Sequence, residues 1–131
     1  MNIKQIIRKN IVAMVAVATI IGFSSFKVAK KFLQPEDGWY EVQQINPSDP
    51  NPNNPSNLEI TSHLSSGLPS GGDCQAVNSS ADRCAVYLNL EDFTTPSPIG
   101  MSVSTATNGT NQGAVDPSSA GTTDGFAKRT D

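Results

Sequence analysis

The sequence predicts a small, mostly irregular protein with an N-terminal hydrophobic signal helix, a small disulfide-linked β-hairpin or β island, and a disordered C-terminal tail. Three observations lead to this fold class. Apolar residues make up only 37% of the 131 residues, below the roughly 45–50% of globular domains. An uncharged apolar run stands near the N-terminus, and two cysteines flank a strand-like segment. We expect three parts, at residues 1–24, 36–93 and 94–131.

The first part has the order of a secretory signal. A basic head precedes the apolar run IVAMVAVATIIGF at residues 11–23, and small residues follow it. Ser24 and Ser25 are the candidate cleavage residues, since Gly22 and Ser24 would place small side chains around the cut. The basic head consists of Lys4, Arg8 and Lys9.

A retained membrane anchor is the alternative for the same segment. As a helix, residues 11–23 would span only about 20 Å, whereas the hydrocarbon core of a bilayer is about 30 Å thick. Three lysines after Phe26 would also weaken the charge asymmetry that orients an anchor. We therefore expect cleavage, with membrane contact only through the N-terminal segment, and an exported location in the periplasm, at the cell surface or in the medium. An uncleaved, outward-facing tether stays open.

Charge argues against nucleic acid as a partner. Three basic and twelve acidic residues follow Lys31, so the formal charge of that part is −9. An acidic body repels phosphate backbones.

The middle part, residues 36–93, contains the strand candidates. Trp39, Tyr40 and Val42 favour a strand after the turn at residues 36–38. The Pro- and Asn-rich stretch 46–57 predicts a wide loop or semi-rigid linker. In it, Asp49, Asn51 and Asn53 alternate like calcium ligands, but Asn54 and Ile60 replace the required Gly and Glu, so no calcium site is expected.

In residues 84–90, the apolar side chains of Cys84, Val86, Leu88 and Leu90 alternate with Ala85, Tyr87 and Asn89, which predicts a strand with one buried face. Residues 74–77 could pair with it to form a β-hairpin. Cys74 and Cys84 are even in number and lie in a chain that is predicted to be exported, so a structural disulfide is expected. Residues 94–131 are rich in Ser, Thr, Gly and Asn without apolar periodicity, which predicts a flexible tail.

No arrangement of residues points to catalysis, a cofactor or a metal. His63 is the single histidine and has no second ligand or nucleophile near it in sequence. Glu91 and Asp92 are adjacent, which suits a solvated turn better than a catalytic pair. We expect no enzyme and no cofactor. Trp39, Tyr40 and Tyr87 are the candidate interaction surface, although a core role for Trp39 is the simpler interpretation.

Several segments together resemble the small uncharacterised exported proteins of Bacteroidetes. These segments are Phe23-Ser24-Ser25-Phe26, Trp39-Tyr40-Glu41-Val42, the stretch 46–57, and Cys74 with Cys84-Ala85-Val86-Tyr87. The resemblance covers about the first two thirds of the chain and implies export and a disulfide, but no chemistry. The expected function is therefore a non-catalytic envelope or secreted protein, structural or with a protein partner in the cell envelope. A membrane-tethered accessory protein is the alternative.

Overall fold

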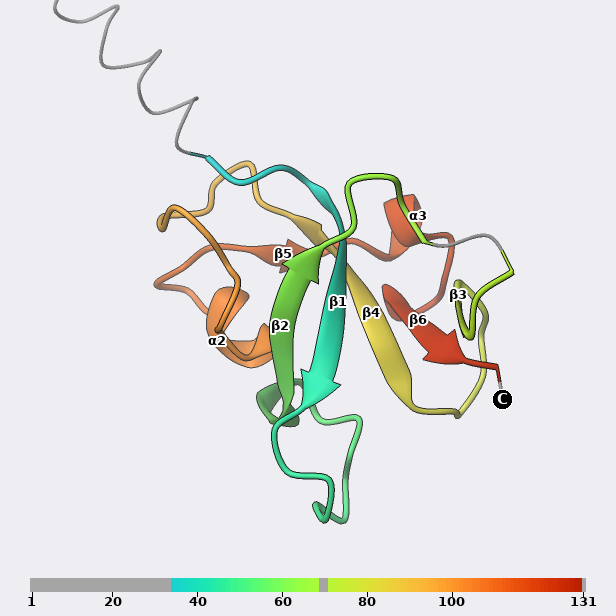
Figure 1. Cartoon of the computed structure of the whole chain (residues 1–131). Coiled ribbons are helices and arrows are strands. Elements are labelled where there is room, and N and C mark those ends of the chain that lie inside the picture. Colours follow the sequence, from blue (N-terminus) through green and yellow to red (C-terminus); the bar gives the residue numbers. More distant parts are fainter. Residues whose placement is uncertain (1–33, 69–70, 131) are drawn as a thin grey trace, which may run out of the picture. The chain divides into compact units, whose positions relative to one another are not determined.

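The computed structural model describes residues 34–68 and 71–130 (Figure 1). Within these residues, six antiparallel strands form one sheet with the order β2-β1-β4-β6-β3, and β5 pairs with β4 beyond the end of β6. The strands are β1 (Gly38–Gln44), β2 (Leu58–His63), β3 (Cys74–Gln75), β4 (Arg83–Asn89), β5 (Ala114–Val115) and β6 (Phe126–Arg129). The short helices are η1 (Pro55–Asn57), α2 (Val103–Ala106) and α3 (Pro117–Ala120). The predicted signal helix lies outside the described residues.

The sheet buries apolar side chains on both faces. The main core lies between the sheet and the irregular chain around α2, and a smaller cluster lies on the other side, with α3 (Figure 1). Alternating side chains of one strand point to opposite faces, which is why Tyr40 enters the main core and its neighbour Trp39 the smaller cluster. The largest completely buried side chains include Leu58, Ile60, Leu88 and Leu90.

The expected small β island with a disulfide is confirmed, but it is larger than the sequence predicts. The flexible tail predicted for residues 94–131 is wrong for residues 94–130, which contain α2, β5, α3 and β6. Val103, Ala106, Phe126 and Ala127 from this part are buried. They are spaced too irregularly to produce a period, because most of them come from turns and four-residue elements rather than from long strands or helices.

Polar side chains hold these irregular segments in place, which composition alone does not reveal. Ser102 caps α2 by accepting a hydrogen bond from the Thr105 N–H, and Asp116 caps α3 by accepting one from the Ser119 N–H. Such caps satisfy N–H groups that a helix leaves free at its start. Ser, Thr, Asn and Asp therefore build local structure here, although their abundance suggested disorder.

The predicted β-hairpin between residues 74–77 and 84–90 is also wrong. β3 and β4 are not neighbours, because β6 pairs with both of them and lies between them in the sheet. The sequence could not reveal this arrangement, since the inserted strand comes more than 30 residues later in the chain. The strand predicted around Trp39 and the loop at 46–57 are found as expected, with η1 ending the loop.

Candidate binding cleft

β1 and β4 diverge towards the C-terminal end of β1 (Figure 1), and a cleft lies between them, lined by residues of both strands. The two strands pair from Gly38↔Leu88 to Glu41↔Ala85, and the pairing stops there although β1 continues to Gln44. A register irregularity between Arg83 and Ala85, where β4 pairs with β6, accompanies the separation. An extra residue of this kind bends a strand and increases its twist. We name the resulting space the β1–β4 cleft and define it by Val42, Gln43, Gln44, Asp82, Arg83 and Arg129.

The β1 wall of the cleft presents backbone groups. The Trp39 carbonyl accepts a hydrogen bond from the Leu64 N–H, and the Ile45 N–H donates to the Asn57 carbonyl, both at 2.8 Å and both on the β2 side. Alternate residues of an antiparallel strand direct their N–H and C=O groups to opposite sides. The backbone of Val42 and Gln44 therefore faces the cleft, beyond the last residue pair with β4.

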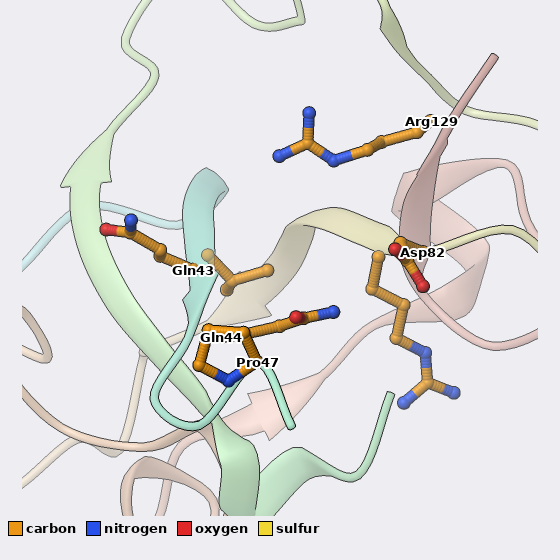
Figure 2. Close-up of a pocket in the computed structure, with 7 residues that line it drawn as sticks. Gln43, Gln44, Pro47, Asp82 and Arg129 are labelled. Carbon is orange, nitrogen blue, oxygen red and sulfur yellow. The ribbon is translucent and has the colours of Figure 1, made fainter. Parts of the chain in front are cut away.

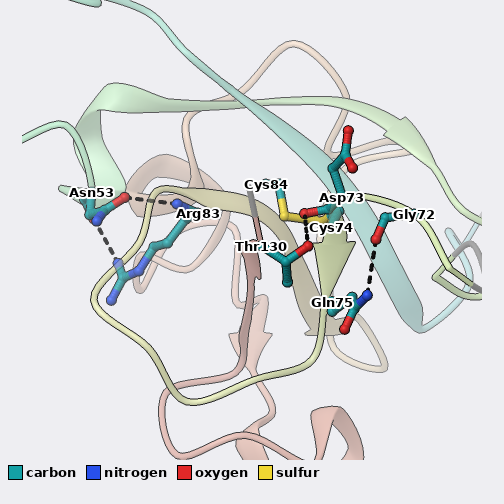
Figure 3. Close-up of a disulfide and its surroundings, with 8 residues drawn as sticks. All are labelled: Asn53, Gly72, Asp73, Cys74, Gln75, Arg83, Cys84 and Thr130. Atoms are coloured by element: carbon teal, nitrogen blue, oxygen red, sulfur yellow. Dashed lines mark hydrogen bonds between the residues drawn. A yellow bond between two sulfur atoms is a disulfide. The ribbon is translucent and has the colours of Figure 1, made fainter.

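On the opposite wall, formed by β4, the backbone N–H of Arg83 is already hydrogen-bonded. This N–H donates to the Asn53 Oδ1 atom at 2.9 Å, and the Arg83 guanidinium donates to the Asn53 carbonyl at 2.7 Å (Figure 3). Asn53 comes from the 46–57 loop and also donates to the Ala81 carbonyl. The loop thus occupies the edge of β4 at the point where β1 leaves it.

The cleft contains two adjacent hollows. The larger one, of about 330 Å³, is lined by Val42, Gln43, Gln44, Pro47, Asp82, Arg83 and Arg129 (Figure 2). In Figure 2 the Arg129 side chain extends from β6 across this hollow, and the Gln44 amide extends from β1 towards the opposite wall. The volume is at the lower end of the range of small-molecule sites, about 300–1,000 Å³.

The smaller hollow, of about 210 Å³, lies beside the disulfide. Val42 and Arg129 line it as well, so these two residues lie between the two hollows. Its other lining residues are Glu41, Leu64, Asp73, Cys74 and Cys84. The lining of the cleft therefore combines apolar groups, from Val42, Leu64 and the cystine, with polar and charged side chains.

Among the described residues, two of the three cations belong to one ion-pair network. Asp124 Oδ2 lies 2.7 Å from the Lys128 Nζ atom and 3.2 Å from the Arg83 Nη2 atom. The Arg83 guanidinium also lies over the Phe126 ring, 3.8 Å from its centroid. Burial raises the pKa of the Asp124 carboxyl, but hydrogen bonds from Lys128 and the Phe126 N–H, with the charges of Lys128 and Arg83, lower this pKa by more, so it lies below 3.8.

Arg129 is the remaining cation of residues 34–68 and 71–130, and no ion pair within this part of the chain involves it. Its side chain is exposed, whereas its backbone N–H donates to the Asp82 carbonyl at 2.9 Å. The carboxylates at the rim are Glu41, Asp73 and Asp82. The cleft thus offers one guanidinium to a ligand within a rim that is otherwise acidic.

The predicted disulfide is present between Cys74 and Cys84, with an S–S distance of 2.05 Å (Figure 3). It joins β3 to β4 at the end of β6, the strand between them. The Thr130 N–H donates to the Asp73 carbonyl at 2.8 Å, next to the bridge. The disulfide therefore forms one side of the smaller hollow and holds together the two strands on either side of β6.

Trp39, Tyr40 and Tyr87 do not form one exposed surface, so the predicted interaction surface is corrected. Trp39 and Tyr40 are 9% and 2% exposed, on opposite faces of the sheet, and Trp39 packs edge-to-face on the half-buried Tyr87. The Tyr40 phenol donates to the Glu36 carbonyl at 2.6 Å. Burial, with the charges of Glu36 and Asp37, raises the pKa of Tyr40 to about 12. Tyr40 is part of the main core, and Trp39 and Tyr87 belong to the smaller cluster.

The other residues considered in sequence have local roles. His63 lies against the Tyr40 ring, with centroids 4.7 Å apart. Asp49 accepts a hydrogen bond from the Asn51 N–H, which builds a turn of the 46–57 loop. Glu91 and Asp92 are exposed in the turn after β4. The candidate cleavage residues Ser24 and Ser25 lie outside the described residues.

No group of three or more His, Cys, Asp or Glu side chains in the described part of the chain is arranged to hold a metal ion. No helix in residues 34–68 or 71–130 is long and apolar enough to cross a membrane.

Sequence analysis missed the cleft residues Gln43, Gln44, Asp82 and Arg129. Arg129 lies in the segment for which the sequence predicts a flexible tail, and the separation of β1 from β4 accompanies a strand irregularity that has no sequence signature. One signal was available. Only three cations follow Lys31 among twelve acidic residues, so each of them was a candidate for a specific role.

The fold and cleft define a small antiparallel β domain with one disulfide. Comparison with known proteins adds no family: no family model, no curated protein and no solved structure matches the chain.

Proposed function

We propose that this chain is an exported, non-catalytic protein of the cell envelope or the extracellular space that acts by binding a partner. The Cys74–Cys84 disulfide is the observation that carries the proposal. Disulfides persist in oxidising compartments and are rare in the cytosol. The basic head and apolar run at the N-terminus support export independently.

The binding role rests on the composition of the β1–β4 cleft. It presents backbone groups, two glutamine amides and one guanidinium, which are recognition groups. The carboxylates Glu41, Asp73 and Asp82 line it without a histidine or a hydroxyl nucleophile among the lining residues. Nucleophilic catalysis by a hydroxyl or a thiol needs such a group beside a base, and both lining cysteines are joined in the disulfide. Binding is the function that this set of side chains supports best.

The resemblance to small exported proteins of Bacteroidetes is part of the same proposal. It predicts the same compartment and the same bridge, and it assigns no chemistry that would compete with a binding role.

The test is the intact mass of the protein recovered from its native host without reductant. We expect a mass that lacks about 24 residues and is two hydrogens lighter than the reduced chain. Treatment with a reductant should restore the two hydrogens and nothing else. A protein with free thiols in the cytosolic fraction would contradict export.

A full-length mass in the membrane fraction, resistant to a high-salt wash, would instead support the tethered alternative. In that case the uncleaved segment 11–26 would hold the β domain at the outer side of the membrane. The cleft would have the same binding role, but its partner would have to be within reach of the membrane.

A further inference from the structure

We propose that the β1–β4 cleft binds a short extended peptide, which pairs with the backbone of Val42 and Gln44 and places a carboxylate against Arg129. This inference deepens the binding role proposed above and names the class of its ligand. Its test uses purified protein, so its outcome does not depend on where the protein is located in the cell.

The backbone edge is the first argument. N–H and C=O groups at an unpaired strand edge are a template for another strand, and several peptide-binding domains add an extended ligand in this way. Val42 and Gln44 direct these groups into the cleft, because Trp39 and Ile45 direct theirs towards β2. Two residues of one edge offer up to four hydrogen bonds, enough for a short peptide segment rather than a long strand.

The position of the edge is the second argument. It lies in a concave space of about 330 Å³ rather than on the outside of the sheet. The neighbouring wall cannot close the gap by itself, because Asn53 already occupies the Arg83 N–H. The β4 wall also diverges from β1 after Ala85. A peptide would therefore add to β1 and be flanked by Asp82 and Arg83 without pairing with them.

Charge is the third argument. Arg129 extends into the larger hollow (Figure 2), whereas the Arg83 guanidinium already donates to the Asn53 carbonyl and to Asp124. A guanidinium binds a carboxylate through two parallel hydrogen bonds. The nearby Glu41, Asp73 and Asp82 oppose further negative charge, so a ligand with one carboxylate and otherwise neutral or basic side chains fits best.

The carboxylate could come from a peptide C-terminus or from an acidic side chain, and three peptide pools distinguish these sources. Each pool contains acetylated hexapeptides of randomised sequence without Cys. The first has free C-termini and lacks Asp and Glu. The second is amidated and contains Asp and Glu. The third is amidated and lacks both residues.

The experiment is a titration of the isotope-labelled protein, in the form that the mass measurement defines, followed by amide NMR. We expect the first or second pool to shift the backbone signals of Val42, Gln44 and Arg129, with the third pool binding at least tenfold more weakly. The pool that binds identifies the source of the carboxylate. If no pool shifts these signals, or if all three act equally, the proposal is wrong.

Two variants at one position separate backbone pairing from side-chain contact. Gln44→Pro removes the N–H that faces the cleft but leaves the β2 pairing of Gln43 and Ile45, and proline is tolerated where the missing N–H faces outwards. Gln44→Ala keeps the N–H and removes only the amide. We expect a loss of binding of at least tenfold for Gln44→Pro and less than threefold for Gln44→Ala. Equal losses would overturn the backbone pairing.

Arg129→Gln removes the charge without changing the backbone. It also tests the proposal if the Gln44→Pro variant does not fold. We expect this variant to bind the preferred pool about tenfold more weakly, the usual scale of a charge-assisted hydrogen bond. Its affinity for the third pool should not change. An unchanged affinity would overturn the role of Arg129. If the protein is exported but binds no peptide, only the peptide-binding inference is wrong. If it binds peptides but is not exported, only the proposed compartment is wrong.

Discussion

At the scale of single residues, one carboxylate, that of Asp124, pairs with two cations. Asp124 pairs with Lys128, whose side chain is 5% exposed, and with Arg83, which packs on Phe126. A buried ammonium without a partner is costly, because it has lost its hydration. The pair therefore allows a lysine to lie in β6, an inner strand of the sheet.

Replacing Asp124 by Asn should lower the free energy of unfolding by about 2 kcal/mol at pH 7, because it leaves Lys128 buried without an anion. The pKa of Asp124 in the folded protein lies below the ordinary 3.8. The carboxylate therefore stabilises the fold at pH values above 3.8, and this contribution is lost as the pH falls through the folded pKa.

Urea unfolding of both proteins at pH 7 and pH 3 measures the effect. The difference between Asp124→Asn and the natural protein should be smaller at pH 3. Asp92→Asn, at an exposed turn, is the matched control and should change little at either pH. A difference that is the same at both pH values would contradict the pairing.

Gly125 is the second residue of note, because its backbone conformation and its close neighbours both require glycine. It adopts a φ of 77°, and a Cβ atom there would collide with the Val115 Cγ1 atom. Gly121 also has a positive φ, of 68°, but a Cβ atom there meets nothing within 4 Å. The two positions share the strained backbone and differ only in the available space.

We expect Gly121→Ala to lower the free energy of unfolding by about 1 kcal/mol, the cost of a left-handed conformation. Gly125→Ala should lower it by about 3 kcal/mol, because overpacking adds to the same strain. Thermal or urea unfolding of the two variants measures the difference. Equal destabilisation would mean that Val115 moves away without cost.

At the scale of elements, β6 decides the architecture. It pairs with β4 on one side and β3 on the other, and it buries Phe126, Ala127 and Lys128. The disulfide joins the two flanking strands at the end of β6. The bridge therefore holds β3 and β4 at the spacing that β6 needs to pair with both of them.

Removing the bridge with Cys74→Ala and Cys84→Ala should lower the free energy of unfolding by about 3 kcal/mol, the value that the chain-entropy model gives for a short loop. Amide exchange should increase most at Lys128 and Arg129, where β6 contacts both flanking strands. Reduction of the natural protein is the control and should give the same loss. A loss below about 0.5 kcal/mol would contradict a structural role for the bridge.

The sequence predicts some elements of this fold and not others, for physical reasons. β1 and β4 are predicted, because Trp39, Tyr40 and Val42 favour strands and residues 84–90 alternate strongly. The disulfide is predicted from the even cysteine count and from the export that the N-terminal segment predicts. β6 is not predicted, because the four residues FAKR carry too little pattern and their burial depends on partners that are distant in sequence. The cleft depends on those same long-range pairings.

At the scale of the whole molecule, the described residues 34–68 and 71–130 belong to one compact unit. The unit has its own core on both faces of the sheet. Small domains often need a covalent link because their cores are limited, and the Cys74–Cys84 bridge is such a link.

A chain cut to residues 34–131 and made in an oxidising compartment should therefore fold by itself. We expect a single cooperative urea transition with a free energy of unfolding of about 5 kcal/mol. The same fragment with both cysteines replaced by alanine is the matched control, and it should unfold at a lower urea concentration. A fragment without dispersed amide NMR signals would show that the preceding residues are required for folding.

The late position of β6 in the sequence has a consequence for the timing of folding. A chain emerges from the ribosome, or from a translocation pore, with its N-terminal end first. Because an inner strand of the sheet comes from residues 126–129, the five earlier strands cannot complete their pairing until these residues have emerged. The sheet therefore closes late, after its other strands are already available, and the final step of folding is the insertion of β6 between β4 and β3.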